Sequence, residues 1–312
     1  MPACITHNLF AKEVGRLCRK QGIPTHDPAM MALGSQGPDV FFFHRAFPWQ
    51  RGERGFKAGI AMHHASPAKL LSVLYHRAVA ETVDPDLMRG YVNGFLCHYV
   101  LDRMAHPFVL YWQEELQKQR PQYGHTPSQY HFCIESALDT RTLRQQTGRL
   151  ISDYDLPRLV PVDDGRRYDA FARLYLPVFG QVLGQWDVTP ERLKQAPGDM
   201  WEAMFWMTDR YGSRQAILRA GERLFSTGAI ATSLLRPLRI DDWDYANESH
   251  ASWHPPTRPE ETTTASFDDL WDAAAEEAVA MIDGFWQTDG SEAAMAELTG
   301  NLDFSANPCE HD

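Results

Sequence analysis

Apolar residues recur at helical spacing along most of the chain. The segment Asn8–Arg19 places Leu9, Val14 and Leu17 on roughly one face of a helix. The same periodicity marks Pro67–Ala80, Asp86–Ala105, Ser128–Arg144, Tyr168–Leu183, Pro190–Tyr211, Ala216–Phe225 and Phe267–Phe285. Strand-like alternation is rare, and no repeated strand–helix–strand spacing occurs. The pattern therefore predicts an all-α fold, a multi-helix bundle of about eight to ten helices.

Gly and Pro residues group between these segments and predict loops there. The groups lie at residues 34–38, 48–55, 121–127, 153–166 and 254–264. The last of them, HPPTRPEETTT, is the strongest loop signal in the chain, but the helix after it is too short to form a domain of its own. We therefore expect a single helical domain over residues 1–312.

The composition narrows the function classes. The chain has 312 residues, 44% of them hydrophobic and 23% charged, which is ordinary for a globular protein. Its formal net charge of −11 disfavours stable nucleic-acid binding, because such binding needs Lys and Arg to neutralise phosphates. Bound divalent metal ions would reverse this locally, so a small anionic substrate remains compatible with the charge.

The ends of the chain and its cysteines predict a cytoplasmic protein. The N-terminus, MPACITH, lacks the basic start and apolar run of a secretory signal. No run of apolar residues is long enough to span a membrane. The cysteines are odd in number, scattered and without a CxxC pair, which favours reduced thiols: Cys4, Cys18, Cys97, Cys133 and Cys309. We interpret them as small buried residues, although Cys97 and Cys133 flank candidate metal ligands.

Histidine is concentrated near the N-terminus, where ten of the 13 residues fall between His7 and His131. Within the apolar segment 93–108, His98, Asp102 and His106 recur every four residues and so form one ridge of a helix. Imidazole and carboxylate groups are ligands that suit Zn²⁺. The ridge rises too far for all three to share one ion, so a pair of metals with Asp102 between them is predicted. Pro107 predicts that the helix ends or bends at His106.

A second pair of candidate ligands follows on the segment 130–139. His131 and Glu135 are again four residues apart, beside an apolar stripe of Ile134 and Leu138. They could complete an ion with His106. Asp139, one turn further on, fits either an acceptor that orients His131 or a neighbour, or a surface carboxylate.

Two short segments could close the site. Asp39 follows a Gly-Pro turn and precedes a hydrophobic run, so its carboxylate can point inward. His63 and His64 stand just before a helix that Ser66 and Pro67 should begin. Adjacent side chains diverge, so we expect only one of this pair to bind metal.

Taken together, these segments resemble the zinc-dependent phospholipase C family, which is related to the S1/P1 nucleases. The resemblance covers residues 1 to about 145 in motif order, with an early His, a GPD turn, a His before a helix, HxxxDxxxHP and then HxxxE. A looser similarity covers DYANESHASWHPP (244–256) and SFDDLWDAA (266–274). The resemblance implies a bundle of the phospholipase C/P1 nuclease type, with a metal-site core at 1–145 and a C-terminal helical elaboration at 146–312.

The family pattern also assigns the ligands. By resemblance, one zinc ion would be held by His63, His98, Asp39 and Asp102, and a second by His106, His131 and Glu135. The family pattern also favours His63 over His64. A third ion would use His7, the bridging Asp and the backbone of a processed N-terminus. Two zinc ions are predicted here, and the third is not part of the prediction. The chain departs from the secreted members of the family in three ways: no signal peptide precedes His7, the spacing from Asp102 to His106 is shorter, and the interval from His106 to His131 is longer.

The resemblance implies phosphodiester hydrolysis, with a phospholipid-like head group as substrate and Asp39 as the base that orients or deprotonates the attacking water. The segment PDVFFFHRAFPW could add an aromatic wall, although its Phe residues fit a buried core better. Three alternatives remain. They are a single-strand nuclease or nucleotidase on the same metals, a non-catalytic metal-stabilised binding protein, and an HD-type phosphohydrolase built on His26 and Asp27, a doublet that reads as a loop.

Overall fold

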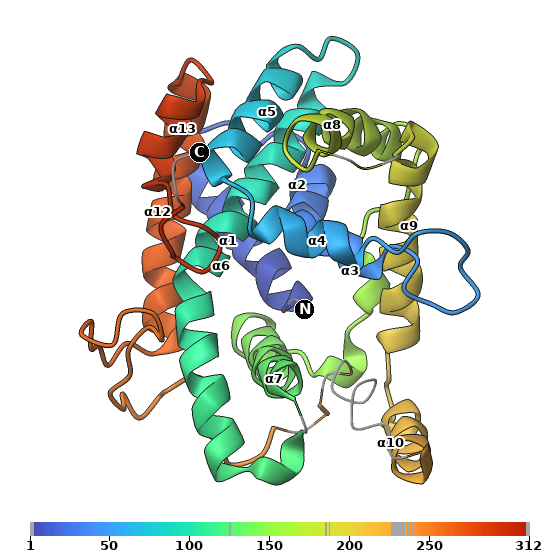
Figure 1. Cartoon of the computed structure of the whole chain (residues 1–312), viewed down its shortest axis with the longest axis vertical. Coiled ribbons are helices and arrows are strands. Elements are labelled where there is room, and N and C mark those ends of the chain that lie inside the picture. The colour runs from blue at the N-terminus through green and yellow to red at the C-terminus, as the bar shows by residue number, and fades with distance from the viewer. Residues whose placement is uncertain are drawn as a thin grey trace.

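The structure is a computed structural model that describes residues 3–124, 126–184, 186, 188–225, 235, 237–238 and 240–309. Helices dominate it, so the all-α prediction is confirmed (Figure 1). The helices are α1 (Cys4–Lys20), α2 (Pro28–Gly34), α3 (Val40–Phe43), α4 (Phe56–His63), α5 (Pro67–Val79), α6 (Pro85–Gln119), α7 (Pro127–Thr147), α8 (Arg167–Gln181), α9 (Pro190–Met207), α10 (Ser213–Phe225), α12 (Phe267–Gln287) and α13 (Glu292–Thr299). Single 3-10 turns lie at η1 (Gly37–Asp39), η2 (Pro121–Tyr123), η3 (Ile151–Asp153) and η4 (Leu156–Leu159). Extended pairing in these ranges amounts to two isolated bridges, Trp253 with Thr263 and Leu302 with Pro308.

Every segment with helical periodicity contains a helix, and the structure adds short helices that the pattern did not predict. These are α2, α3, α4 and α13, each of eight residues or fewer. Two or fewer turns give too few positions for a period of 3.6 to stand out. The missed α4 matters most, because His63 is its last residue.

Of the two outcomes predicted at His106, an end or a bend of the helix, the end is wrong, because α6 continues through Pro107 to Gln119. Proline removes one backbone N–H and disfavours the helix before it, at a cost of about 3 kcal/mol. Beyond it, Phe108, Val109 and Leu116 are buried in the core. Burying a large apolar side chain stabilises by about 1.5–3 kcal/mol, so these contacts outweigh the local cost of the proline.

The long helix α6 is the central column of the fold and packs against α1, α2, α5, α7, α8 and α12 (Figure 1). Its approach to α2 is close enough to require glycine. A Cβ atom on Gly34 would lie 2.0 Å from the Tyr91 carbonyl oxygen, and one on Gly94 would lie 2.1 Å from the Met31 carbonyl oxygen. This contact holds the turn η1, which follows α2, against the middle of α6.

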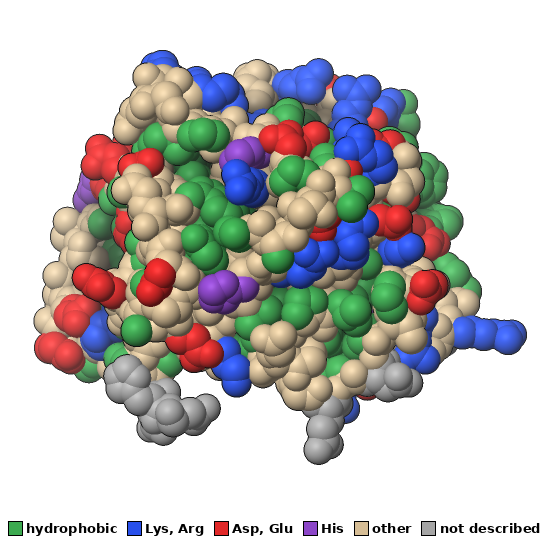
Figure 2. Space-filling view, turned by 90° about the horizontal axis from the view of Figure 1, so that it is seen from above, with side chains coloured by type: hydrophobic (Ala, Val, Ile, Leu, Met, Phe, Trp, Pro, Cys, Tyr) green, Lys and Arg blue, Asp and Glu red, His purple; other side chains and the backbone are tan. Residues whose placement is uncertain are grey.

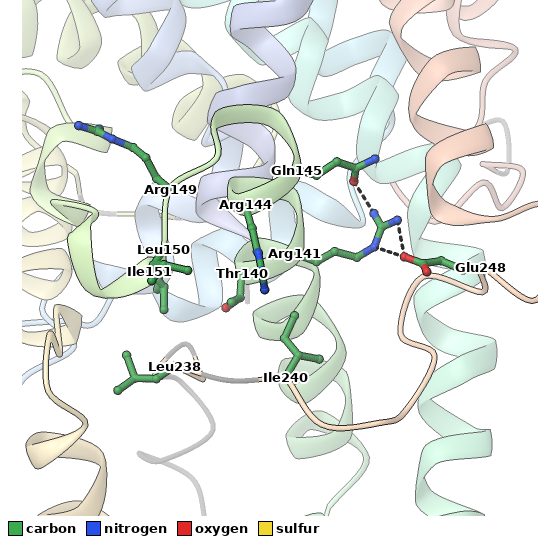
Figure 3. Close-up of a pocket in the computed structure, with 10 residues that line it drawn as sticks. All are labelled: Thr140, Arg141, Arg144, Gln145, Arg149, Leu150, Ile151, Leu238, Ile240 and Glu248. Carbon is green, nitrogen blue, oxygen red and sulfur yellow. Dashed lines mark hydrogen bonds and ion pairs between the residues drawn. The ribbon is translucent and has the colours of Figure 1, made fainter.

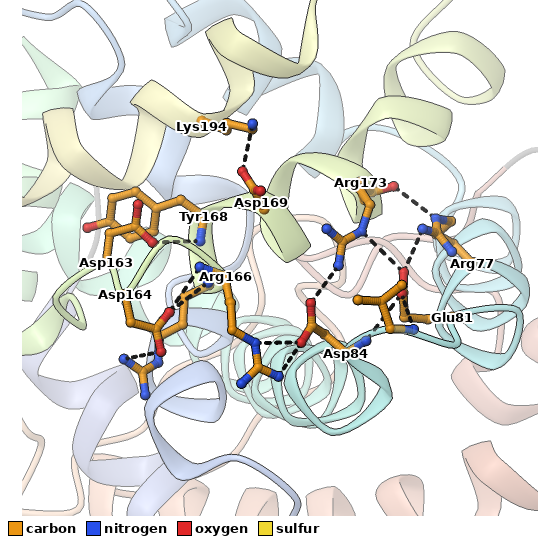
Figure 4. Close-up of polar contacts among 12 residues, drawn as sticks. Arg77, Glu81, Asp84, Asp163, Asp164, Arg166, Tyr168, Asp169, Arg173 and Lys194 are labelled. Atoms are coloured by element: carbon orange, nitrogen blue, oxygen red, sulfur yellow. Dashed lines mark hydrogen bonds and ion pairs between the residues drawn. The ribbon is translucent and has the colours of Figure 1, made fainter.

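Ion pairs around two buried carboxylates connect α8 with the junction of α5 and α6 (Figure 4). Glu81 and Asp84 are buried carboxylates. Arg173 of α8 bridges them, with its Nε 3.3 Å from Glu81 and its Nη2 3.0 Å from Asp84. Arg77 pairs with Glu81 at 2.7 Å, and Arg166 pairs with Asp84. Two buried carboxylates at one junction are tolerated because three guanidinium groups face them.

The surface charge is uneven. Figure 2, which looks onto the top of the molecule as drawn in Figure 1, shows Lys and Arg side chains grouped on part of this face, although the chain carries a net charge of −11. None of the helices in the described ranges is long and apolar enough to cross a membrane. Local basic regions thus exist on an acidic protein.

Removing the bridging guanidinium should destabilise the fold. We expect Arg173→Met to lower the free energy of unfolding by about 2–3 kcal/mol, because Glu81 and Asp84 then keep fewer partners in a buried setting. Denaturant unfolding of wild type and variant measures the difference. Arg158→Met is the matched control, since Arg158 forms an exposed pair with Asp155, and it should change stability by less than about 0.5 kcal/mol.

The difference in the free energy of unfolding between wild type and Arg173→Met should depend on pH. Burial acts to raise the pKa of Glu81, but the backbone N–H groups of Val83 and Asp84 and the charges of Arg173 and Arg77 lower it overall from its ordinary 4.5. The contribution of Glu81 to stability is therefore present above pH 4.5 and is lost as the pH falls through the lowered value. A gap between wild type and Arg173→Met that widens on acidification would contradict this account.

Candidate metal centre

Three side chains of α6 form the axis of the site. His98 and Asp102 are buried and His106 is partly buried, each one turn after the last. The Oδ2 atom of Asp102 lies 3.2 Å from Nε2 of His98 and 3.8 Å from Nε2 of His106. The carboxylate thus reaches both imidazoles, as the four-residue spacing predicts.

A first group of ligands gathers on the N-terminal side of this ridge. His63, at the end of α4, has its Nε2 atom 3.3 Å from Oδ1 of Asp39 and 3.7 Å from Oδ2 of Asp102. Asp39 is buried in η1, which the close contact of α2 and α6 holds in place. One donor atom each of His63, His98 and Asp102 lies within 4.8 Å of the others. That spacing allows a single ion to bind all three.

A second group lies one turn further along α6. Donor atoms of His106, His131 and Glu135 also lie within 4.8 Å of one another. His131 and Glu135 come from α7, with Nε2 3.1 Å from Oε1. A capping box of Thr126 and Gln129 begins α7 one turn before His131 and so fixes where this pair lies. The packing of α7 on α6 thus brings His131 and Glu135, which the sequence pairs by spacing, to His106.

His7 joins the first group from α1. Its Nε2 atom is 3.0 Å from Oδ1 of Asp102, and its ring centroid is 4.4 Å from that of His98. It also forms a possible ligand group with Asp39 and His98. Its buried Nδ1 atom has no hydrogen bond within the described residues. His7 is therefore positioned for a metal ion, whereas Met1 and Pro2, whose backbone a third ion would use, lie outside the described residues.

Asp139 supports the position of His7 indirectly. The carboxylate is fully buried, so its interpretation as a surface group is wrong. Its Oδ1 atom accepts hydrogen bonds from the backbone N–H and the hydroxyl of Thr6, both at 2.8 Å. Since Thr6 precedes His7 in the first turn of α1, Asp139 anchors the backbone that carries this histidine.

The outer nitrogen atoms of four histidines are held by oxygen acceptors. In three of them the acceptor of Nδ1 is a backbone carbonyl oxygen: that of Ser35 for His98 at 3.1 Å, that of Gly59 for His63 at 2.8 Å and that of Phe304 for His106 at 2.8 Å. In His131 the acceptor is the side-chain oxygen of Gln113, at 3.0 Å. A carbonyl oxygen only accepts, so Nδ1 carries the proton and Nε2 is left to face the carboxylates. In the neutral ring that Nε2 atom holds a lone pair, and this is the orientation of metal-binding histidines. The residues present therefore fit a zinc site.

The electrostatics point the same way. Burial acts to lower the pKa of His63, but hydrogen bonds to Asp102 and Asp39 raise it to about 10. Burial acts to raise the pKa of Glu135, but the charge of His131 helps to lower it to about 2. The pKa of Asp102 is held well below its usual range by the surrounding histidines, against the effect of burial. His106 differs, because burial is the larger effect and lowers its pKa. Buried carboxylates that stay ionised need positive charge beside them, which protonated histidines supply in the metal-free site and a divalent cation would supply in their place.

A cavity of about 200 Å³ opens beside the ligands. Phe42, Ile60 and Leu110 line its apolar part, and Ser305 and His64 add polar groups. A larger cavity, of about 910 Å³, lies elsewhere along α7 and is lined by residues that include Arg141, Arg144 and Glu248 (Figure 3). Its lining residues include no histidine. The ligand chemistry thus coincides with the smaller cavity.

The structure separates the other candidates from the cluster. His64 is exposed and belongs to none of the ligand groups formed by the described residues. His26 and Asp27 do not form an HD-type site, because Asp27 accepts from the Met30 N–H as the N-cap of α2 and His26 faces Asp86. None of the five cysteines belongs to those ligand groups.

Sequence reasoning missed the groups that orient the histidines. Gln113 follows His106 by seven residues and so continues the same ridge of α6, a signal that was available. Phe304 carried no such signal. Its carbonyl oxygen accepts from His106, and its ring lies 4.9 Å from that of His63. The C-terminal segment after α13 therefore covers the centre, through contacts that only the tertiary structure creates.

Comparisons with known proteins add no assignment: no protein-family model matches the chain, and neither a curated protein nor a solved structure matches it. The interpretation of the site therefore rests on its motifs and geometry.

Metal analysis tests the site directly. Protein purified without a metal-affinity tag should contain about two zinc ions per chain, and His63→Ala or Glu135→Ala should each lose about one of them. His64→Ala is the matched control, because it changes an adjacent, exposed imidazole and should keep both ions. Fewer than about one ion in the wild type, or equal loss in His63→Ala and His64→Ala, would refute the site.

Gln113 should affect the affinity for the second ion although it is not itself a ligand. We expect Gln113→Leu to weaken retention of that ion about 10–100-fold, since His131 then loses the acceptor that orients it. Competition with a chromophoric chelator measures the affinity. Gln119→Leu, an exposed change on the same helix, should leave it unaltered.

Proposed function

We propose that this protein is a zinc-dependent phosphodiester hydrolase of the phospholipase C type, acting on a phospholipid-like phosphodiester. The observation that supports it most is the pair of adjacent ligand groups that open onto one cavity, with Asp102 of the first group 3.8 Å from His106 of the second. Two adjacent metal ions are the usual device for in-line displacement at phosphorus. The order of the motifs along residues 7–135 agrees with the phospholipase C pattern.

The ligands divide into two sets in this proposal. His63, His98, Asp39 and Asp102 would hold one zinc ion, and His106, His131 and Glu135 the other. His7 would serve a third ion if one binds. When bound, the zinc pair lowers the pKa of water towards about 7 and stabilises negative charge on phosphoryl oxygens.

Asp39 is the residue we assign to proton transfer. Its buried carboxylate lines the cavity, 3.3 Å from Nε2 of His63, and it stands on the short turn η1 rather than within a long helix. There it can orient an attacking water and accept its proton. His63 adjoins the carboxylate and is itself held at Nδ1 by the Gly59 carbonyl, so the pair keeps a fixed geometry.

The apolar wall of the cavity suits an organic phosphodiester. The Phe42 ring is stacked on that of His63, with centroids 5.5 Å apart and 16° between the planes. It is also the partly buried member of the run Phe41–Phe43, whereas its two neighbours are buried in the core. With Ile60 and Leu110 it can exclude water from one side of a bound phosphoryl group.

The alternatives have less support. A nuclease on long nucleic acid would have to attract a polyanion to a chain of net charge −11. A non-catalytic metal-stabilised protein would saturate its metals with protein ligands, whereas here a cavity adjoins both groups. Both remain outcomes of the experiment below.

Hydrolysis of an aryl phosphodiester tests the proposal. We expect zinc-loaded wild type to cleave bis(p-nitrophenyl) phosphate, chelation to abolish the activity and added zinc to restore it. Asp39→Asn should lower kcat by about 10²–10⁴-fold, the usual contribution of a positioned base. Metal content measured on the same variant separates loss of a base from loss of a ligand. His76→Ala, which removes an exposed imidazole of α5 that does not line the cavity, should retain wild-type activity.

A substrate panel distinguishes the alternatives. Short-chain phosphatidylcholine, single-stranded DNA and a nucleoside monophosphate would be compared at equal concentration. The proposal expects preference for the lipid; preference for DNA or the nucleotide would favour the nuclease reading. Zinc-loaded protein inactive on every substrate would contradict the enzyme assignment.

A further inference from the structure

An aromatic surface formed by one loop and one helix remains without a role in the chemistry above. It is formed by Phe47 and Trp49 of the loop between α3 and α4 and by Trp201, Phe205 and Trp206 of α9. The members form a continuous chain of ring contacts. Trp49 stacks on Phe47 at 4.6 Å and meets Trp206 at 6.1 Å, while Phe205 lies 5.8 Å from Trp206 and 6.0 Å from Trp201.

All of these side chains except Phe47, which is partly buried, are exposed although they are large and apolar. The exposed fraction is 57% for Trp49, 47% for Trp206 and 46% for Phe205. Single exposed apolar residues are ordinary on a protein surface, but a contiguous group of aromatic rings marks an interaction site. Figure 1 shows the loop that carries Trp49 projecting outward beside α9. The aromatic surface therefore stands at a protruding edge of the molecule.

Positive charge outnumbers negative charge around the aromatic rings, although Glu202 of α9 accepts a hydrogen bond from Nε1 of Trp49. The loop segment 45–57 contains Arg45, Arg51, Arg54 and Lys57 against one acidic residue, Glu53, on a chain that is strongly acidic overall. Arg51, Arg54 and Lys57 are exposed. The guanidinium of Arg214 lies over the rings of Phe205 and Trp206, at 5.7 and 5.5 Å.

We propose that this aromatic surface docks the protein on an anionic phospholipid bilayer, an inference that rests on the proposed function. Tryptophan prefers the membrane–water interface, since its ring is apolar and its Nε1–H group is polar. Exposed Lys and Arg near the surface are attracted to anionic lipids. The combination of aromatic rings with a locally basic loop matches such a surface.

The docking surface also connects to the metal centre. The loop that carries Trp49 leads directly into α4, whose exposed Phe56 contacts Phe42 at 5.3 Å. Ile60 of the same helix is 39% exposed and lines the cavity beside the ligands. A bilayer that meets the loop would thus lie against the element that ends in His63, next to the mouth of the cavity.

Vesicle sedimentation tests the proposal without turnover. Wild type should bind vesicles of phosphatidylcholine with about a third phosphatidylserine, and added salt should weaken the binding. On binding, tryptophan emission should shift to shorter wavelength and be quenched by brominated lipid. The double variants Trp49→Ser/Trp206→Ser and Arg51→Glu/Arg54→Glu should each lower the partition coefficient by about tenfold or more.

Matched controls keep the outcome clear. Val83→Ser/Val162→Ser removes exposed apolar side chains elsewhere, and Arg158→Glu reverses an exposed charge elsewhere. Both should bind vesicles as wild type does, and circular dichroism verifies that every variant is folded. Unquenched tryptophan emission of wild type on anionic vesicles would overturn docking regardless of the variants.

The two proposals can fail separately. If vesicles bind but bis(p-nitrophenyl) phosphate is not cleaved, docking stands and the proposed function falls. If the soluble substrate is cleaved but vesicles do not bind, docking falls alone. A wild type that dimerises in solution, with Trp49→Ser/Trp206→Ser monomeric and vesicle binding absent, would assign the aromatic surface to a second copy of the chain instead.

Discussion

A single buried carboxylate, Asp102, sets the arrangement of the centre. Its two oxygens lie within 3.8 Å of the Nε2 atoms of His7, His63, His98 and His106. An ionised carboxylate in the interior costs several kcal/mol unless positive or polar groups compensate for it. The helices α1 and α4 must therefore bring their histidines to α6, and the packing of the N-terminal half follows from that requirement. A metal ion bound at this position would satisfy the same carboxylate and leave the imidazoles neutral.

Close packing of the helices around this carboxylate positions the ligands. Glycine at 34 and 94 lets α2 touch α6 and so places η1 and Asp39 beside the ridge. Continuation of α6 beyond Pro107 keeps Gln113 in line with His106, where it reaches His131. Four of the histidines, His63, His98, His106 and His131, are also held at Nδ1. The centre is thus oriented by backbone and amide oxygens as much as by its ligands, which is typical of built metal sites.

Charge is distributed differently over the chain as a whole, the centre and the loop between α3 and α4. The body of the protein is acidic, the interior of the centre balances carboxylates with imidazoles, and the loop between α3 and α4 is basic and aromatic. Exposed Trp and Phe side chains lower solubility unless a partner covers them, so their grouping beside Arg and Lys gives this edge of the molecule a different character from the rest. The proposed membrane-docking surface and the cavity beside the ligands can thus be separate parts of the molecule.

What the sequence determined was local. The spacing of four places His98, Asp102 and His106 on one ridge and pairs His131 with Glu135, because an α-helix has a fixed 3.6-residue turn. Helical periodicity likewise determined the fold class. The tertiary structure decided which ridge faces which, that His63 ends a short helix, that α6 passes through its proline, and that the Phe304 carbonyl covers His106. Those outcomes depend on burial and on contacts between residues far apart in the chain, and no local period encodes them.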